Sequence, residues 1–207
     1  MIIAIDGPAG AGKSTVARRL AERLGVRYLD TGAMYRAVTW LALREDIPLE
    51  DGERLGELAT EHPVDLDTEG HVAIAGEDVT AAIRETRIDR AVPVVAQHPE
   101  VRAVMRERQR ELASQADAVM EGRDIGTVVA PGADVKVYLT ADEGIRARRR
   151  QFERPDIGAD ALATDLRLRD ESDASRMEPA QDAIHIDTSE LDVEGVVSLI
   201  EELVRGG

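Results

Sequence analysis

The sequence predicts an α/β fold in which a parallel sheet is covered by helices on both faces. Short apolar runs of strand length alternate along the 207-residue chain with segments whose apolar residues recur at helical spacing, and this alternation is typical of parallel sheets. The first apolar run, residues 1–6, ends in a glycine-rich turn, which suits a strand buried on both faces. The chain length fits one compact domain with a modest insertion.

The elements of this fold can be assigned in order from the N-terminus. Apolar residues at helical spacing predict a helix after the first strand, namely Val16, Ala17, Leu20, Ala21 and Leu24, and Gly25 is expected to end it. A second strand at 26–30 precedes a helix that carries Ala33, Ala37, Trp40 and Leu41 on one face. Three more strands are predicted at 116–121, 134–139 and 183–187, with further helices around 99–113, 141–153, 159–172 and 192–204.

Two segments interrupt this alternation. Residues 61–95 predict short antiparallel strands at 63–67 and 71–75, a Gly-Glu-Asp turn at 76–78 and a small helix beside them,. We therefore divide the chain into a core, residues 1–60 and 96–207, and an insertion, residues 61–95. The second segment, 153–158, contains proline and glycine, and it is either a mobile flap or an ordinary turn.

Composition excludes several functional classes. The formal net charge of −15 and the aromatic content of 2% oppose nucleic-acid or anionic-membrane binding and stacking platforms for bases. The sequence has no cysteine, so it predicts neither a disulfide framework nor a thiolate metal site,. The four histidines do not have the spacing of metal ligands,. No apolar run reaches about 18 residues, and the N-terminus lacks a signal-peptide layout. We expect a cytoplasmic monomer without nucleic-acid or membrane partners.

A phosphate-binding loop is the strongest local signal. The pattern G-x-x-x-x-G-K-[ST] is matched by Gly7, Pro8, Ala9, Gly10, Ala11, Gly12, Lys13 and Ser14, with Thr15 next. It lies between a predicted strand and a predicted helix, which is the context that the pattern requires. Backbone N–H groups and the helix N-terminus would cradle phosphates, while Lys13 would reach the β- and γ-phosphates and Ser14 would ligate Mg²⁺.

The loop alone does not name the reaction, because GTPases, ATPases and small-molecule kinases all use it. The stretch 67–70 formally matches the D-x-x-G pattern of GTPases. However, it lies in the predicted insertion rather than at the end of a core strand, and no N-K-x-D motif that would read guanine occurs. We regard the match as accidental. The residues that bind the phosphoryl acceptor must therefore show which of these protein classes the chain belongs to.

Four polar clusters are candidates for that acceptor side. Residues 30–36 either bind a second phosphate or cap a helix. The stretch 121–127 follows a core strand, where ligands of α/β sheets bind, although its charged pair could also be a surface ion pair. Arg169, Asp173 and Arg176 have i, i+4, i+7 spacing on one helical face, which is either a site or a solvated ladder. The arginine-rich stretch 146–150 is a candidate lid over ATP.

Taken together, these segments resemble a known family. The segments GPAGAGKST, YLDTGAMYRA, AIR…VR…QR, EGRDIGTVV, RLRDESDASR and HIDTSELDVEGVV resemble, in order and spacing, those of bacterial cytidylate kinases. The resemblance implies a P-loop kinase of nucleoside monophosphates with a five-stranded parallel sheet in the order 2-3-1-4-5. It also implies a short lid at about 150–160 and a small antiparallel sheet in an enlarged insertion at 61–95.

The same resemblance implies a set of site residues. Catalysis would use Lys13, Arg123 and Arg176, and the lid residue Arg149 would join the phosphate loop in binding ATP with Mg²⁺. The acceptor CMP or dCMP would be held at its phosphate by Arg123 and Arg176 with Thr31, Tyr35 and Arg36 close by, at its ribose by Arg169 and Asp173, and at its base by Arg102 and Asp124. A carboxylate that accepts from the exocyclic amine of cytosine would reject uracil.

One position departs from the family pattern. Relatives often carry a base-contacting serine where this chain has Pro93, which has neither a hydroxyl nor an N–H group. Base selectivity would therefore be either looser or supplied by other groups, and the pyrimidine assignment rests more heavily on Arg102 and Asp124. The alternatives are a related kinase with UMP or another small acceptor, and an ATP-binding regulatory module without turnover.

Overall fold

The computed structural model describes residues 1–68, 70–155 and 157–206. Glu69 of the predicted insertion, Asp156 of the predicted lid and Gly207 lie outside the described residues. The chain divides into two compact units, one formed by residues 1–28 with 117–207 and the other by residues 29–116.

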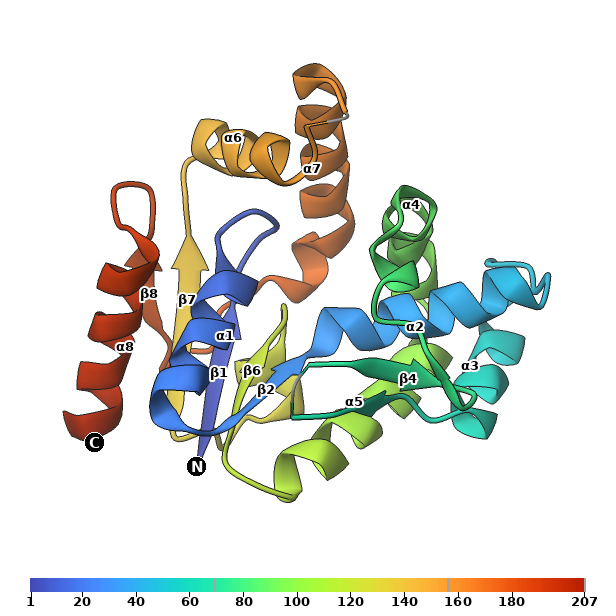
Figure 1. Ribbon diagram of the computed structural model, residues 1–207, viewed down its shortest axis with the longest axis horizontal. Helices are drawn as coiled ribbons and strands as arrows, with labels where there is room; N and C mark the ends of the chain where they lie inside the picture. Colours follow the sequence, from blue (N-terminus) through green and yellow to red (C-terminus); the bar gives the residue numbers. More distant parts are fainter. Residues whose placement is uncertain (69, 156, 207) are drawn as a thin grey trace. The chain divides into compact units, whose positions relative to one another are not determined.

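The large sheet has the predicted strands and the predicted order. Its five strands are β1 (Ile2–Asp6), β2 (Arg27–Asp30), β6 (Ala118–Glu121), β7 (Val135–Thr140) and β8 (Ile184–Asp187). They are arranged β2-β6-β1-β7-β8 (Figure 1), which is 2-3-1-4-5 when only these strands are counted. β1 pairs in parallel with β6 and β7, and β7 with β8. The carboxyl ends of these strands therefore meet at one edge of the sheet, where ligands of such sheets bind.

The first unit also contains the helices that surround the phosphate loop. These are α1 (Lys13–Leu24), a π-helical turn at Ile125–Val129, α6 (Glu143–Glu153), α7 (Ala159–Asp173), a 3₁₀ turn at Ala174–Arg176 and α8 (Val193–Gly206). Leu20 of α1 and Val197 of α8 are fully buried in one apolar cluster with Ile3, Ile5 and Leu139 of the sheet, and these helices pack against each other (Figure 1). The cluster fixes the loop between β1 and α1 because both flanking elements are buried in it.

The second unit combines helices with a small antiparallel sheet. Its helices are α2 (Thr31–Arg44), α3 (Gly52–Glu61), a 3₁₀ turn at Ala82–Arg84, α4 (Thr86–Val95) and α5 (Pro99–Ser114), and its strands are β3 (Asp65–Leu66), β4 (Val72–Ile74) and β5 (Glu77–Asp78). The strand order is β3-β4-β5, so the predicted small antiparallel sheet is confirmed, and it has three strands. The small helix predicted beside it is α4, and Pro93 lies within this helix.

The turn of the small sheet lies one residue earlier than predicted. Ala75 and Gly76 form it, with φ of 52° and 76°, and two consecutive positive φ angles are the mark of a type I′ hairpin turn. Glu77 and Asp78, which were predicted to be in the turn, pair with Ile74 and Ala73 as β5. The prediction of a turn at 76–78 was therefore wrong in its boundaries, because a two-residue loop leaves the next residues free to pair.

Helix α3 was not predicted. Asp51 caps it by accepting the Arg54 N–H at 3.0 Å, and Leu55 and Leu58 are fully buried. A Cβ at Gly56 would lie 2.8 Å from the Cβ of Glu100, so this glycine permits the close approach of α3 to α5. Among the described residues, no helix combines the length and hydropathy needed to cross a membrane.

Candidate active site

The phosphate loop lies between β1 and α1, and three of its glycines are required by its shape. Gly7 has φ of +143°, and a Cβ there would lie 2.1 Å from the Leu139 carbonyl oxygen of β7. Gly10 and Gly12 have φ of +77° and +88°, a region that other residues rarely adopt. Gly12 is also the N-cap residue immediately before α1. A loop with these positive φ angles before a helix N-terminus is suited to binding an anion through its backbone N–H groups.

Lys13 is the first residue of α1 and is buried beneath this loop. Its Nζ donates to the Pro8 carbonyl oxygen at 2.9 Å. Burial, together with the positive charge of Arg123, lowers the pKa of Lys13 from 10.5 to about 7. A bound anion would favour the charged ammonium, so the electrostatic state of this lysine fits a site built for phosphates.

Ser14 hydrogen-bonds to Glu121, the first residue of the candidate stretch 121–127, which was not predicted as a partner of Ser14. Its Oγ donates to Glu121 Oε2 at 2.9 Å, and the Tyr28 hydroxyl donates to Oε1 of the same carboxylate. Glu121 is buried at the carboxyl end of β6. A hydroxyl beside a carboxylate offers the oxygen donors that Mg²⁺ prefers, so Ser14 and Glu121 fit a magnesium ion bound with nucleotide.

Three predicted acceptor-side residues are brought together in the first unit. Arg123 Nε donates to Asp173 Oδ2 at 2.8 Å, and its Nη1 donates to the Gly7 carbonyl oxygen at 2.7 Å. Arg176 Nη2 donates to the other oxygen of Asp173 at 2.5 Å and to the Ser172 carbonyl oxygen at 3.1 Å. Asp173 therefore bridges two arginines, and one of these arginines is bonded to the phosphate loop.

The predicted helical face of this cluster needs a correction. α7 ends at Asp173, and Arg176 lies in the following 3₁₀ turn, so Arg169, Asp173 and Arg176 do not share one continuous helix. The tighter turn suits the i, i+3 pair of Asp173 and Arg176, because residues three apart eclipse in a 3₁₀ helix. Arg169 remains on α7, one turn before Asp173.

Two arginines of α6 lie against the phosphate loop. Arg146 is buried, and its Nη1 donates to the Ala9 carbonyl oxygen at 3.1 Å and to Asp170 Oδ2 at 2.7 Å. Arg149 donates to both the hydroxyl and the carbonyl oxygen of Thr188, at 2.9 and 2.6 Å. The arginine-rich stretch thus includes a structural anchor, Arg146, and the predicted ATP residue Arg149, whose position depends on Thr188.

The second unit carries the remaining predicted residues. Thr31, Tyr35 and Arg36 lie on α2, and Arg102 lies on α5. Asp30 caps α2 by accepting the Ala33 N–H at 2.8 Å, and the phosphate contacts predicted for Thr31, Tyr35 and Arg36 are compatible with this cap and stay a prediction.

Asp30 also belongs to a network of charged side chains. Arg84 Nη2 donates to Asp30 Oδ2 at 2.9 Å, and Arg36 Nη2 lies 3.2 Å from Asp89 Oδ1. Burial opposes ionisation of Asp30, but Arg36 and Arg84 hold its pKa below the usual range. Two arginines thus converge beside the start of α2. Arg84 was not a predicted site residue, because its pairing with Asp30 joins residues 54 positions apart.

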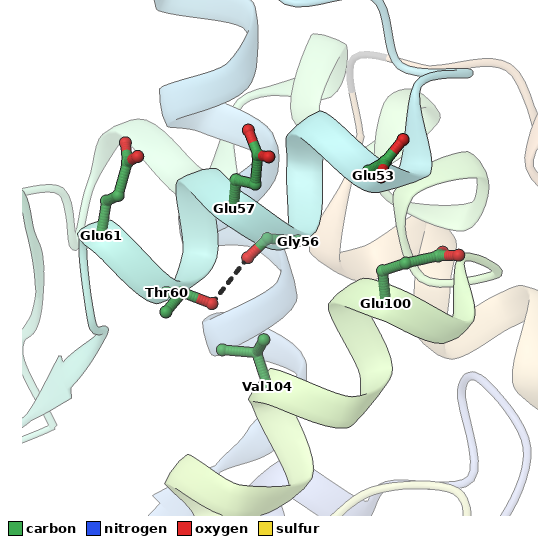
Figure 2. Close-up of a pocket in the computed structure, with 7 residues that line it drawn as sticks. All are labelled: Glu53, Gly56, Glu57, Thr60, Glu61, Glu100 and Val104. Atoms are coloured by element: carbon green, nitrogen blue, oxygen red, sulfur yellow. Dashed lines mark hydrogen bonds between the residues drawn. The ribbon is translucent and has the colours of Figure 1, made fainter.

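A separate acidic hollow of about 430 Å³ lies in the second unit. Figure 2 shows its lining, in which Thr60 Oγ1 donates to the Gly56 carbonyl oxygen. The remaining lining residues are Glu53, Glu57, Glu61, Glu100 and Val104. Four carboxylates repel phosphate, and none of the predicted site residues lines this hollow. We therefore assign it no part in nucleotide binding.

Comparisons with known proteins identify the family and the fold. The family model described as cytidylate kinase matches residues 3–206. A cytidylate kinase of Shouchella clausii is 47% identical over 98% of this chain and 95% of the relative, and one of Caldanaerobacter subterraneus is 47% identical over 98% and 94%. Among solved structures, a shikimate kinase from Bacteroides thetaiotaomicron shares the fold, with a TM-score of 0.53 at 18% identity over 99% of this chain and 98% of its own. A gluconokinase from Sinorhizobium meliloti shares it as well, with a TM-score of 0.52 at 18% identity over 98% and 91%. The chain therefore belongs to the cytidylate kinase family.

Proposed function

We infer that this protein is a nucleoside monophosphate kinase that transfers the γ-phosphoryl group of ATP to CMP or dCMP, giving ADP and CDP or dCDP. Family membership across residues 3–206 supports this reaction. The observation that carries the assignment is the bond between Arg123 and the Gly7 carbonyl oxygen. It joins an arginine proposed to hold the acceptor phosphate to the loop proposed to hold ATP, as an in-line transfer between two bound nucleotides requires.

On the donor side, the backbone N–H groups of the phosphate loop would hold the β- and γ-phosphates. Lys13 would regain its full charge against them and stabilise the charge that develops near the β,γ-bridge. When bound, Mg²⁺ would neutralise charge on the phosphates of ATP. Ser14 would hold the ion, with Glu121 orienting the Ser14 hydroxyl, and Arg149 would contact ATP from α6.

On the acceptor side, Arg123 and Arg176 would clamp the phosphate of CMP. Both are partly buried and held by Asp173, so they need little reorganisation to receive a phosphate. Asp173 would then turn to the ribose together with Arg169. The contacts of Thr31, Tyr35 and Arg36 with the acceptor phosphate stay predictions. Positioning and charge neutralisation do most of the work of phosphoryl transfer, so we assign no general base.

Base recognition would rest on Arg102 and Asp124, and this role gives a selective prediction. Asp124→Ala should lower kcat/KM for CMP by about tenfold to a hundredfold, in line with the cost of losing one good base contact. The loss with UMP should be much smaller, because uracil presents an acceptor rather than an amine to this carboxylate. Steady-state kinetics with both acceptors measures the two losses on the same preparation. Equal losses would show that Asp124 does not read the amine.

The reaction itself is tested by coupled ADP release over a panel of CMP, dCMP, UMP and AMP. We expect the highest kcat/KM with CMP or dCMP and little ADP without an acceptor. Activity with UMP or AMP but not with CMP would replace the cytidine assignment by a related kinase. No ADP with any acceptor would favour an ATP-binding module. The monomeric state, the cytoplasmic location and the role of 61–95 as the acceptor-binding insertion stay predictions.

A further inference from the structure

Asp6 is a buried carboxylate that the proposed chemistry does not use. It ends β1 immediately before the phosphate loop, and only 6% of it is exposed. Its two oxygens accept backbone N–H groups from one place in the chain, Ile125 N at 2.9 Å and Gly126 N at 2.8 Å. A buried carboxylate whose two oxygens both accept hydrogen bonds from adjacent backbone amides is expected to hold those amides in place.

These two amides begin the π-helical turn at Ile125–Val129. The first N–H groups of a helical turn lack partners within it, and a negative charge at that end is favourable. The carboxylate of Asp6 therefore fixes where the turn starts. The residues just before that start are Arg123 and Asp124, the proposed phosphate and base contacts.

A third hydrogen bond closes the arrangement. Arg123 Nη1 donates to the carbonyl oxygen of Gly7, the residue after Asp6. Residues 6–7 are thus bonded to both sides of Asp124, at residue 123 before it and at residues 125–126 after it. The contact is also tight, because a Cβ at Gly126 would lie 3.4 Å from Asp6 Oδ2 and 3.3 Å from Lys136 Cδ.

We propose that Asp6 is a positioning residue that sets the cytosine selectivity of the enzyme by fixing the placement of Asp124 from the phosphate-loop side. The inference rests on the proposed function, in which Asp124 reads the exocyclic amine. Asp6 itself touches no substrate. Its effect passes through the two amides to the turn, and a displacement of Asp124 by a fraction of an ångström is enough to weaken a hydrogen bond to the base.

Asp6→Asn tests this role with little change in volume. One amide N–H₂ group must then face a backbone N–H group, so two donors meet where a donor and an acceptor met before. We expect KM for CMP to rise about tenfold and the ratio of kcat/KM for CMP over UMP to fall about fivefold or more. The Kd of an ATP analogue should change by less than about threefold, because the phosphate-loop contacts of ATP do not include this carboxylate.

Asp134→Asn is the matched control. Asp134 Oδ2 accepts the backbone N–H of Ile2 at 2.7 Å, so this carboxylate makes the same kind of bond to the opposite end of the same strand, β1. The CMP over UMP ratio and the KM for CMP should stay as in the wild-type enzyme. Both quantities are independent of the fraction of active protein, so a loss of stability alone does not change them.

Gly126→Ala covers the case in which Asp6→Asn does not fold. The added methyl group would lie 3.3 Å from Lys136 Cδ, a tight contact, and 3.4 Å from Asp6 Oδ2. The start of the turn must therefore shift slightly, and a loss of selectivity in the same direction should appear. An unchanged CMP over UMP ratio and KM in whichever variant folds would overturn the proposal and leave Asp6 with a structural role. A wild-type enzyme that fails to phosphorylate CMP would instead overturn the proposed function, so the two failures are distinguishable.

Discussion

Replacing Lys13 by methionine is expected to lower kcat by about 10³-fold, because the charge that develops near the β,γ-bridge loses its buried ammonium partner. The same substitution should stabilise the nucleotide-free protein. Burial and Arg123 depress the pKa of Lys13 in the folded state to about 7, against 10.5 for the unconstrained side chain. Folding at neutral pH therefore disfavours the protonated form that the unfolded chain prefers.

The pH dependence of this effect has a definite sign. Between about pH 7 and pH 10.5, which are the two pKa values of Lys13, the unfolded state binds more protons than the folded state, so the Lys13 contribution to the free energy of unfolding rises with pH. The Lys13→Met variant should lack this contribution. Denaturant unfolding of both proteins at pH 7 and pH 9 measures this contribution. It is the change in the free energy of unfolding between the two pH values for the wild type, minus the same change for the variant. A variant that is less stable than the wild type at pH 7 would contradict the burial argument.

Arg176→Ala is expected to have the second largest effect, which should fall on the acceptor alone. The variant removes one of two arginines that converge on Asp173, and charge-assisted contacts to phosphate are among the strongest polar contacts in proteins. We expect kcat/KM for CMP to fall about 10²-fold or more. The Kd of an ATP analogue should stay close to that of the wild type.

The matched control for Arg176→Ala is Arg205→Ala. Arg205 also pairs with an acid, Glu201, but its side chain is 75% exposed on α8, so its loss should change neither quantity. If the rate of the Arg176→Ala variant depends on CMP concentration as that of the wild type does, the Arg123–Asp173–Arg176 cluster is a purely structural ion-pair network. A variant that loses ATP binding instead would place Arg176 on the donor side.

The large sheet could be predicted because its strands carry a local signal. Each strand is a short apolar run, and each following helix repeats apolar residues at helical spacing, so the order of elements can be read from neighbours in the sequence. Helix α3 was not predicted because its N-terminal signal is a single cap at Asp51. In addition, Gly56 weakens the helix propensity of the segment and is present for contact with α5. The type I′ turn at Ala75–Gly76 was misplaced because alanine rarely adopts positive φ.

The parts of the candidate site that lie in a contiguous motif could be predicted from the sequence. The contacts between residues far apart in the sequence could not. The phosphate loop follows from one contiguous pattern. The partnership of Ser14 with Glu121 joins residues 107 positions apart, and that of Arg149 with Thr188 joins residues 39 positions apart. Glu121 and Asp6 are each an acid at the end of an apolar strand. This is the sequence signal that could have identified them, because strand ends meet at the ligand edge of the sheet.

The central claim is that the chain transfers a phosphoryl group between two nucleotides rather than to water. ATP labelled in its γ-phosphoryl group, mixed with excess enzyme and CMP and stopped within one turnover, tests this claim most directly. The label should appear in CDP, and without CMP it should remain in ATP. Label released as inorganic phosphate at a rate that does not depend on CMP would contradict the account and make the protein an ATPase.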